Sequence, residues 1–264
     1  MPKKKLLNME NGVSAMVTDG EYLYVKSQRD MYKYDTSNMS LVAHNVLKSG
    51  AEWGFAVHGN HISFFNHLDF FMMDKDLQFV CAERLGENIS SDVLGLMWFD
   101  APNAYVNIRN GWIYELDINT KKVEKYHVLD SSSWSFSGTE NFLYAGTVSG
   151  WLVEIDKKAL KVTRKIQLCK HNVFKVVHED GFIYTLSRDY SVRVIDVASF
   201  EVVHTIKKVR NFVLTEGFIV AKKPPMAWDK RTFQLVGQVG VPLGLKLNDG
   251  RVLVSDNQGV YEVI

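Results

Sequence analysis

A short apolar and aromatic run recurs along the whole chain of 264 residues and limits the folds open to it. Seven copies start 33 to 43 residues apart. They occupy residues 22–25, 61–64, 104–107, 142–145, 182–185, 218–221 and 251–254. Periods of this length are typical of repeat architectures, in which each unit buries its apolar surface against its neighbours.

Turn signals flank each copy. An Asp-Gly pair directly precedes several of them, as at residues 19–20 and 180–181. Asp-Gly between apolar runs favours a hairpin because the turn needs positive φ at its centre. A second turn, such as 109–111, leads into a third apolar run, and a more polar alternating fourth run follows, as at 122–128. Each unit of about 38 residues is therefore predicted to contain four short antiparallel strands.

The repeat predicts an all-β fold, a seven-bladed β-propeller with four antiparallel strands per blade. An open sheet of about 28 strands would exceed the usual size of open sheets. The last unit ends with the third-strand run 260–264, and residues 3–9 form an unassigned run before the first inner strand at 13–18. We expect the N-terminal strand to join the C-terminal blade and close the ring, making residues 1–264 a single domain. The alternative for residues 3–9 is a frayed basic tail.

The third run of most units ends in aspartate. These residues are Asp35, Asp74, Asp117, Asp156, Asp196 and Asp229. An aspartate in this place can accept hydrogen bonds from the backbone N–H groups of the following turn. We therefore expect these carboxylates to stabilise turns.

Three units carry motifs of a known family. Residues 185–196 (TLSRDYSVRVID) resemble the WD40 signature, with Ile195 where tryptophan is usual, and Trp228 precedes Asp229 as a literal Trp-Asp pair. Residues 145–156 are similar to both WD40 and quinoprotein-like repeats. The resemblance implies that His171, Ser187 and Asp189 form a hydrogen-bonded structural network inside a blade, without catalysis. It also implies a rigid platform for interactions.

No catalytic, nucleotide-binding or metal-binding motif is present in the sequence. It contains neither Gly-x-x-x-x-Gly-Lys nor Gly-x-Gly-x-x-Gly, no Gly-x-Ser-x-Gly elbow and no His-Glu-x-x-His pair. Its two cysteines, Cys81 and Cys169, lie far apart and make no disulfide framework. We therefore expect no catalytic residue, no cofactor and no metal, and an enzyme is the less favoured class.

The charges nearly balance, with 31 Lys and Arg against 30 Asp and Glu and a formal net charge of +1. Nucleic acid is an unfavoured partner because phosphate contacts need concentrated cations. No run of 18 apolar residues and no secretory h-region occurs, so we expect no membrane partner and a cytoplasmic location. A monomer is the expected state.

The fourth-to-first loops and the second-to-third turns of a propeller open on one face. Here these segments are rich in Arg, Lys, His and Trp, and Trp, Tyr and Arg dominate the energetics of protein interfaces. We predict that this face binds a protein partner, although cationic turns can also be merely solvated. The predicted binding residues are Arg29, Trp53, His67, Arg109, Trp134, Arg188, Tyr190, Arg210, Lys222 and Lys223.

A second hypothesis places a small molecule in the central funnel, as in lyase-like or quinoprotein-like propellers. Apolar walls with a few polar groups suit a ligand site, and a histidine near a glutamate suits acid–base chemistry. The residues expected near the funnel mouth are Glu52, Trp53, His67, Trp134 and His171.

Overall fold

The computed structural model describes most of the chain and divides it into two compact units. Unit 1 contains Met1–Arg84 and Gln238–Ile264, and unit 2 contains Leu85–Gly237. The described residues are 3–47, 53–58, 60–66, 69–84, 93–100, 102–214, 217–221, 226–238, 245–246, 252–256 and 259–263. The expectation that residues 1–264 make a single domain stays a prediction.

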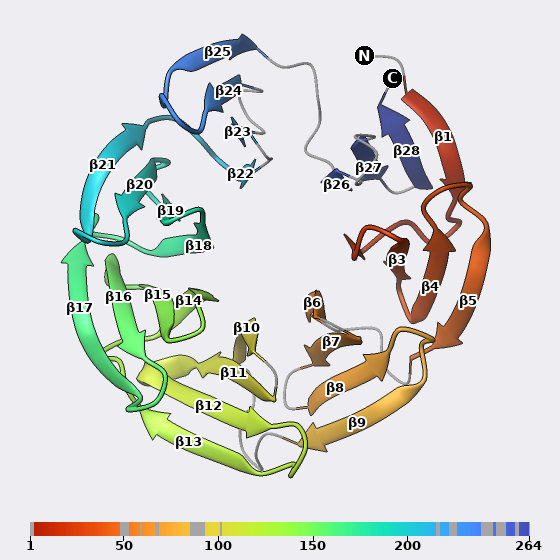
Figure 1. Ribbon diagram of the computed structural model, residues 1–264, viewed down its shortest axis with the longest axis horizontal. Helices are drawn as coiled ribbons and strands as arrows, with labels where there is room; N and C mark the ends of the chain where they lie inside the picture. Colours follow the sequence, from red (N-terminus) through yellow and green to blue (C-terminus); the bar gives the residue numbers. More distant parts are fainter. Residues whose placement is uncertain are drawn as a thin grey trace. The chain divides into compact units, whose positions relative to one another are not determined.

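Unit 1 consists of four-stranded antiparallel sheets, each with its strands in the predicted order (Figure 1). The first contains β2 (Ala15–Thr18), β3 (Tyr22–Ser27), β4 (Asp30–Asp35) and β5 (Leu41–Val46). The next contains β6 (Trp53–His58), β7 (His61–Asn66), β8 (Asp69–Asp74) and β9 (Phe79–Arg84). The last contains β26 (Leu245–Lys246), β27 (Val252–Asp256), β28 (Gly259–Val263) and β1 (Lys3–Asn8).

Unit 2 repeats the same arrangement. Its sheets are β10 (Val93–Asp100), β11 (Asn103–Ile108), β12 (Trp112–Asp117) and β13 (Val123–His127), then β14 (Ser133–Gly138), β15 (Phe142–Thr147), β16 (Trp151–Asp156) and β17 (Lys161–Gln167). They continue with β18 (Val173–Glu179), β19 (Phe182–Ser187), β20 (Val192–Asp196) and β21 (Glu201–Ile206), then β22 (Phe212–Leu214), β23 (Phe218–Ala221), β24 (Met226–Asp229) and β25 (Leu235–Gln238). Arg109–Gly111 forms a single 3-10 turn, and the described residues contain no α-helix. Within this unit, Figure 1 shows the first strand of each sheet on the inner side and the fourth on the outer side.

The recurring run of the sequence is the second strand of every sheet, as predicted. In β3, β15 and β19 every residue after the first is buried. The fourth strands β5, β17 and β21 are mostly exposed and alternate in burial, as edge strands do. Burial of both faces explains why the second strands are continuous apolar runs and the fourth strands alternate.

The hydrophobic core lies in layers between neighbouring sheets. In unit 2 one layer joins Tyr105 and Ile113 to Leu143 and Ile155. The inner strands are also linked there by side chains, because the Ser135 hydroxyl accepts from the Val176 N–H at 2.8 Å. Burying such apolar surface contributes about 25 cal/mol per Å². Within a unit, each sheet is therefore stabilised by the sheets beside it in the sequence.

The N-terminal strand does pair with the C-terminal strand, inside unit 1. β1 runs antiparallel to β28, with Lys4 opposite Glu262 and Lys5 opposite Tyr261. Leu6 and Leu7 pack against a core cluster that includes Leu253 and Val260. Residues 3–8 are thus an ordered strand and not a frayed tail.

The aspartates at the ends of the third strands stabilise turns, as predicted. The Asp196 carboxylate accepts from the Ser199 N–H at 2.8 Å and from the Ser199 hydroxyl at 3.0 Å. Asp229 accepts from Arg231 and Thr232 in the same way. Hydrogen bonds to the charged form hold the pKa of each of these carboxyls below its ordinary value.

We expect the carboxyl of Asp196 to titrate below 3.8 in the folded protein, and Ser199→Ala to raise its pKa toward that value. The substitution removes the hydroxyl donor and keeps the backbone N–H. Because the folded pKa is lowered, this contribution to stability is present above the unfolded pKa and is lost as pH falls through the folded pKa. Carboxyl ¹³C NMR titration measures the pKa of Asp196 in the unsubstituted protein and in the Ser199→Ala variant. Asp117, which lies in a different turn, is the internal control. A pKa of Asp196 at or above 3.8 in the unsubstituted protein would contradict the turn assignment.

Candidate interaction face

The second-to-third turns and the fourth-to-first loops of unit 2 open at the same ends of their strands, and we call them together the loop face. The turns contain residues 109–111, 148–150 and 188–191, and the loops contain residues 128–132, 168–172 and 207–211. Seven of the ten predicted binding residues lie in the described part of the chain, five with their side chains and two, Trp53 and Arg109, with the backbone alone.

Backbone hydrogen bonds tie each of these loops to the turn of its own sheet. The carbonyl of Gly111 accepts from the Leu129 N–H at 3.1 Å, and the carbonyl of Gly150 accepts from the Leu168 N–H at 2.9 Å. In the next sheet the carbonyl of Tyr190 takes this place and accepts from the Val209 N–H at 2.8 Å. The same contact thus recurs in three consecutive sheets.

Further hydrogen bonds connect the turns of neighbouring sheets. Ser132 accepts from the Asn110 N–H with its hydroxyl at 2.9 Å and from the Val148 N–H with its carbonyl at 2.9 Å. The Asn172 carbonyl accepts from the Arg188 N–H at 2.8 Å. Backbone groups that are paired in this way hold the loops in one conformation, so side chains on them are presented without a large ordering cost on binding.

Tyr190 lies at a turn position that the two preceding sheets fill with glycine. Gly111 and Gly150 have φ of +80 and +87, and Tyr190 has φ of +58. Positive φ is uncommon for a large side chain, although third-to-fourth turns of this chain also contain it, as at the buried Phe200. The Tyr190 ring is 50% exposed, and the Arg210 guanidinium lies 5.7 Å from its centroid. The turn therefore holds an aromatic ring and a guanidinium together at the surface.

Two aromatic residues occupy β-bulges at the start of the inner strands. The pairing of β14 with β15 skips Trp134, and the pairing of β18 with β19 skips Phe174. The two rings meet edge to face with centroids 6.5 Å apart, and Phe174 is 39% exposed. With its amide oxygen toward the indole, Asn172 accepts from Trp134 Nε1 at 3.1 Å. Bulges of this kind redirect side chains, here toward the inner edge of the loop face.

The expected structural network contains Ser187 and Asp189 but is built around Arg193. The Arg193 guanidinium donates to Asp189 at 3.2 and 2.5 Å and to the Ser187 hydroxyl at 3.4 Å. Burial pushes the pKa of Asp189 up, but Arg193 and the Ser191 N–H outweigh it, so this pKa lies below its ordinary value. The His171 side chain is exposed and makes no hydrogen bond to Ser187 or Asp189 in the described part of the chain. The sequence motif predicted the segment that contains the network but not the role of Arg193 at the centre of the network.

Several predicted residues cannot be placed on this face. Glu52, His67, Lys222 and Lys223 lie outside the described residues. Trp53 lies in β6 and Arg109 in the 3-10 turn by their backbones, and their side chains lie outside the described part. Arg29 is exposed at the equivalent turn of unit 1, where its carbonyl accepts from the Leu47 N–H at 2.7 Å. The funnel hypothesis depends in part on Glu52, Trp53 and His67, so it stays a prediction.

Sequence reasoning missed Phe174 and Lys175. Phe174 follows the first residue of its inner strand just as Trp134 does, so alignment of the units would have found it. Lys175 Nζ donates to the Phe212 carbonyl at 2.7 Å and lies 4.8 Å from the centre of the Phe212 ring. Burial lowers the pKa of this ammonium. Nothing in the sequence marks this lysine as half-buried, because its environment comes from β22.

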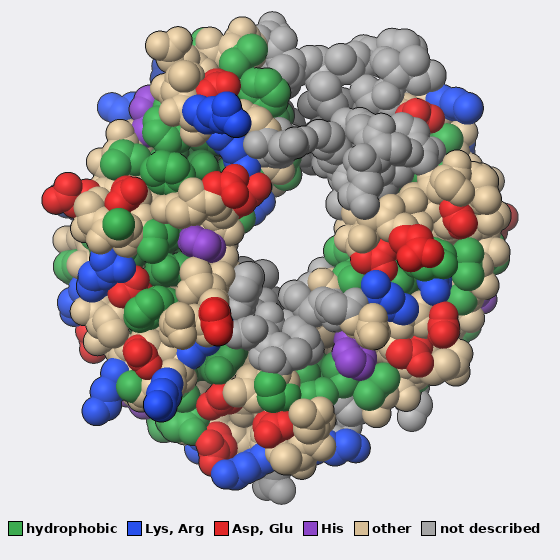
Figure 2. All heavy atoms as spheres, viewed as in Figure 1, with side chains coloured by type: hydrophobic (Ala, Val, Ile, Leu, Met, Phe, Trp, Pro, Cys, Tyr) green, Lys and Arg blue, Asp and Glu red, His purple; other side chains and the backbone are tan. Residues whose placement is uncertain are grey.

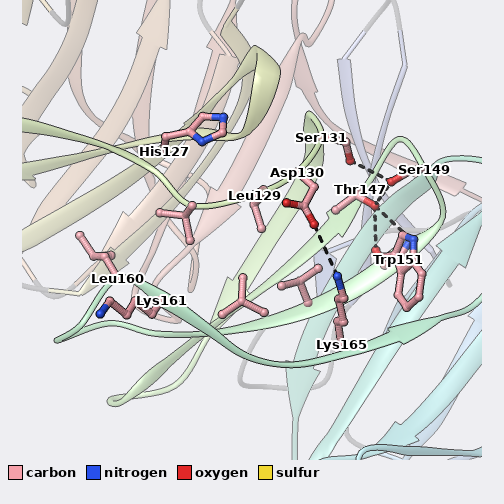
Figure 3. A pocket seen from close by; sticks show the side chains of 13 residues that line it. His127, Leu129, Asp130, Ser131, Thr147, Ser149, Trp151, Leu160, Lys161 and Lys165 are labelled. Carbon is pink, nitrogen blue, oxygen red and sulfur yellow. Dashed lines mark hydrogen bonds and ion pairs between the residues drawn. The ribbon is translucent and has the colours of Figure 1, made fainter.

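A cavity of about 410 Å³ lies beside the loop face, between the sheet β10–β13 and the sheet β14–β17 (Figure 3). Its floor includes Leu129 and Leu160, and the hydroxyls of Ser131 and Ser149 meet at 2.9 Å on its rim. Lys165 reaches the exposed carboxylate of Asp130 at 3.4 Å. The polar groups at this rim thus partner one another.

Among the described residues there is no group of three or more His, Cys, Asp or Glu side chains that could hold a metal ion. No helix in the described part is long and apolar enough to cross a membrane. Cys169 is a free thiol that donates to the His171 carbonyl at 2.7 Å.

Comparison with known proteins supports the fold. No protein-family model matches the chain, and no curated protein matches it either. The β-propeller domain of Myceliophteria thermophila Cps50 (Swd1) is similar over 96% of this chain and 96% of that chain, with a TM-score of 0.75 and 12% identity. The computationally designed Ika8 protein is similar over 98% of this chain and 97% of that chain, with a TM-score of 0.67 and 12% identity. The chain is therefore an all-β β-propeller, which confirms that part of the prediction.

We expect Gly150→Ala to destabilise the protein far more than Gly181→Ala. Both glycines have positive φ, +87 and +78, so both variants lose about 1–2 kcal/mol from the backbone. At Gly150 the added Cβ would also lie 2.1 Å from the Cys169 carbonyl oxygen, whereas at Gly181 it meets open space. Urea unfolding midpoints measure the difference. Equal losses of stability in the two variants would contradict the close contact between the turn at Gly150 and the loop at Cys169.

Proposed function

We propose that this propeller is a non-catalytic scaffold that binds a protein partner through its loop face. The single observation that supports this most is Tyr190, an exposed ring in a positive-φ turn whose neighbours use glycine. Side chains of Tyr, Trp and Arg supply most of the binding energy at protein interfaces, particularly where they are already ordered. Tyr190 and Arg210 meet both conditions.

The proposal includes a monomer in a reducing compartment, the cytoplasm. The two cysteines, Cys81 and Cys169, lie far apart in the sequence and make no disulfide framework, which fits such a compartment. We also infer that the propeller has seven blades and that the pairing of β1 with β28 closes its ring. The seven copies of the second-strand run support the count, and the pairing of Lys4 with Glu262 supports the closure.

Deletion of residues 1–8 should lower the melting temperature by at least about 5 °C. The deletion removes β1, leaves β28 as an unpaired edge, and exposes the apolar surface that Leu6 and Leu7 cover. The variant Lys3→Gln, Lys4→Gln removes two charges and keeps the strand, so its melting temperature should stay close to that of the natural sequence. Calorimetry compares the three proteins, and an unchanged transition after deletion would contradict the closure.

Tyr190→Gly should abolish partner capture without destabilising the fold. Glycine suits the positive φ and is the residue that equivalent turns contain, so the hydrogen bond from Val209 is kept. Loss of a central aromatic residue typically costs at least about 2 kcal/mol of binding energy, which is about thirtyfold in affinity. Affinity capture from cells of the source organism, followed by quantitative mass spectrometry, measures the recovered proteins.

Val203→Ser is the matched control for this experiment. Val203 is 49% exposed on the outer strand β21, so the control also removes exposed apolar surface, but away from the loop face. Proteins that bind the loop face should be retained by Val203→Ser and lost with Tyr190→Gly. Equal recovery with both variants would remove the loop face as the binding surface.

A further inference from the structure

Five cationic side chains gather at one end of the sheet β18–β21, and we call them the basic patch. They are Lys170, Arg188, Lys207, Lys208 and Arg210. All five are exposed. The patch is contiguous because Arg188 is hydrogen-bonded to the loop that contains Lys170, and Tyr190 to the loop that contains Arg210.

In the described part of the chain, no acidic side chain neutralises the basic patch. Residues 168–172, 188–191 and 207–211 contain one acidic residue, Asp189, and Arg193 occupies both of its carboxylate oxygens. In the described part of the chain none of the five cations forms an ion pair. The patch therefore keeps its positive potential, although the net charge of the whole protein is only +1.

Other lysines of the described residues do pair with acids. On the opposite ends of the strands of unit 2, Lys230 lies 2.7 Å from Glu179, and in unit 1 Lys75 lies 2.6 Å from Asp19. Figure 2 shows acidic and basic side chains interspersed over the described parts of the face turned to the viewer. The unbalanced charge of the basic patch is thus a local feature and not the general pattern of the surface.

We propose that the basic patch binds an acidic segment of a partner protein, with an apolar side chain of that segment packed on Tyr190. This inference rests on the proposed function and adds the chemistry of the partner. The Tyr190 ring supplies the apolar contact at the edge of the patch, and the surrounding cations supply attraction and orientation.

An acidic protein segment fits this surface better than a nucleic acid does. Nucleic acids need cations along an extended path that follows the phosphate backbone. The neighbouring loop of residues 128–132 contains no Lys or Arg and carries Asp130, which is 96% exposed. On this side the positive surface of the described residues therefore ends at the sheet β18–β21, which fits a short peptide.

The test uses the full chain and a fluorescein-labelled peptide in which glutamates flank a single leucine. Fluorescence anisotropy at low salt should show binding that weakens as salt is added, because screening shortens the reach of exposed charges. The variant Lys170→Glu, Lys207→Glu should bind the peptide at least about tenfold more weakly. These two lysines have no described ion pair, so their replacement leaves the fold intact.

The control variant is Lys158→Glu, Arg231→Glu, which changes the net charge by the same amount. Both residues are exposed in third-to-fourth turns, at the opposite ends of the strands from the loop face. Peptide affinity should stay within about twofold of that of the natural sequence. An equal loss with the control would show attraction to the overall charge and would overturn the proposal.

Two other results would overturn it. One is the absence of peptide binding at low salt, and the other is tighter binding of oligothymidine than of the peptide through the same lysines. If the peptide fails to bind while Tyr190→Gly still loses the captured protein, the acidic chemistry is wrong and the proposed function stands. If Tyr190→Gly loses nothing while the peptide binds through the two lysines, the basic patch stands and the wider loop face is wrong.

Discussion

The backbone hydrogen bond from each fourth-to-first loop to the second-to-third turn of its sheet is the contact on which the loop face depends. It recurs at the carbonyls of Gly111, Gly150 and Tyr190. The close approach leaves no room for a Cβ at Gly111 or Gly150, so the glycines follow from the contact. At Tyr190 the turn is one residue longer and φ is +58, so the carbonyl accepts the same kind of loop hydrogen bond while the ring lies at the surface.

Stability and recognition depend on different parts of each repeat. The layers between sheets are apolar and repeat from unit to unit, whereas the loops carry side chains that differ in each repeat. A repeat fold can therefore vary its loops without changing its core. The basic patch shows the result, because its charges occur at the end of one sheet and are not balanced within the described residues.

Much of the fold could be predicted from the sequence, and less of the site. The second strands and the turn aspartates follow from local patterns, since strand periodicity and turn chemistry act over a few residues. The pairing of residues 3–8 with the last strand was predicted from the repeat, because the last unit ends after its third strand. The exposure of Phe174 was not predicted, because it depends on a β-bulge. The place of Arg193 in the hydrogen-bonded network was not predicted, because the WD40-like motif assigns that place to His171, whose side chain is exposed here.

The sequence by itself determined that this chain forms repeated four-stranded sheets, because apolar runs with hairpin turns between them can bury their surface only in that way. Only the tertiary structure decided which charged side chains are neutralised. Lys175 is half-buried against β22 and Lys230 is buried beside Glu179, while Lys170 and Lys207 remain exposed and unpaired among the described residues. The physical reason is that pairing and burial depend on neighbours from other sheets, and a sequence pattern of one unit does not contain them.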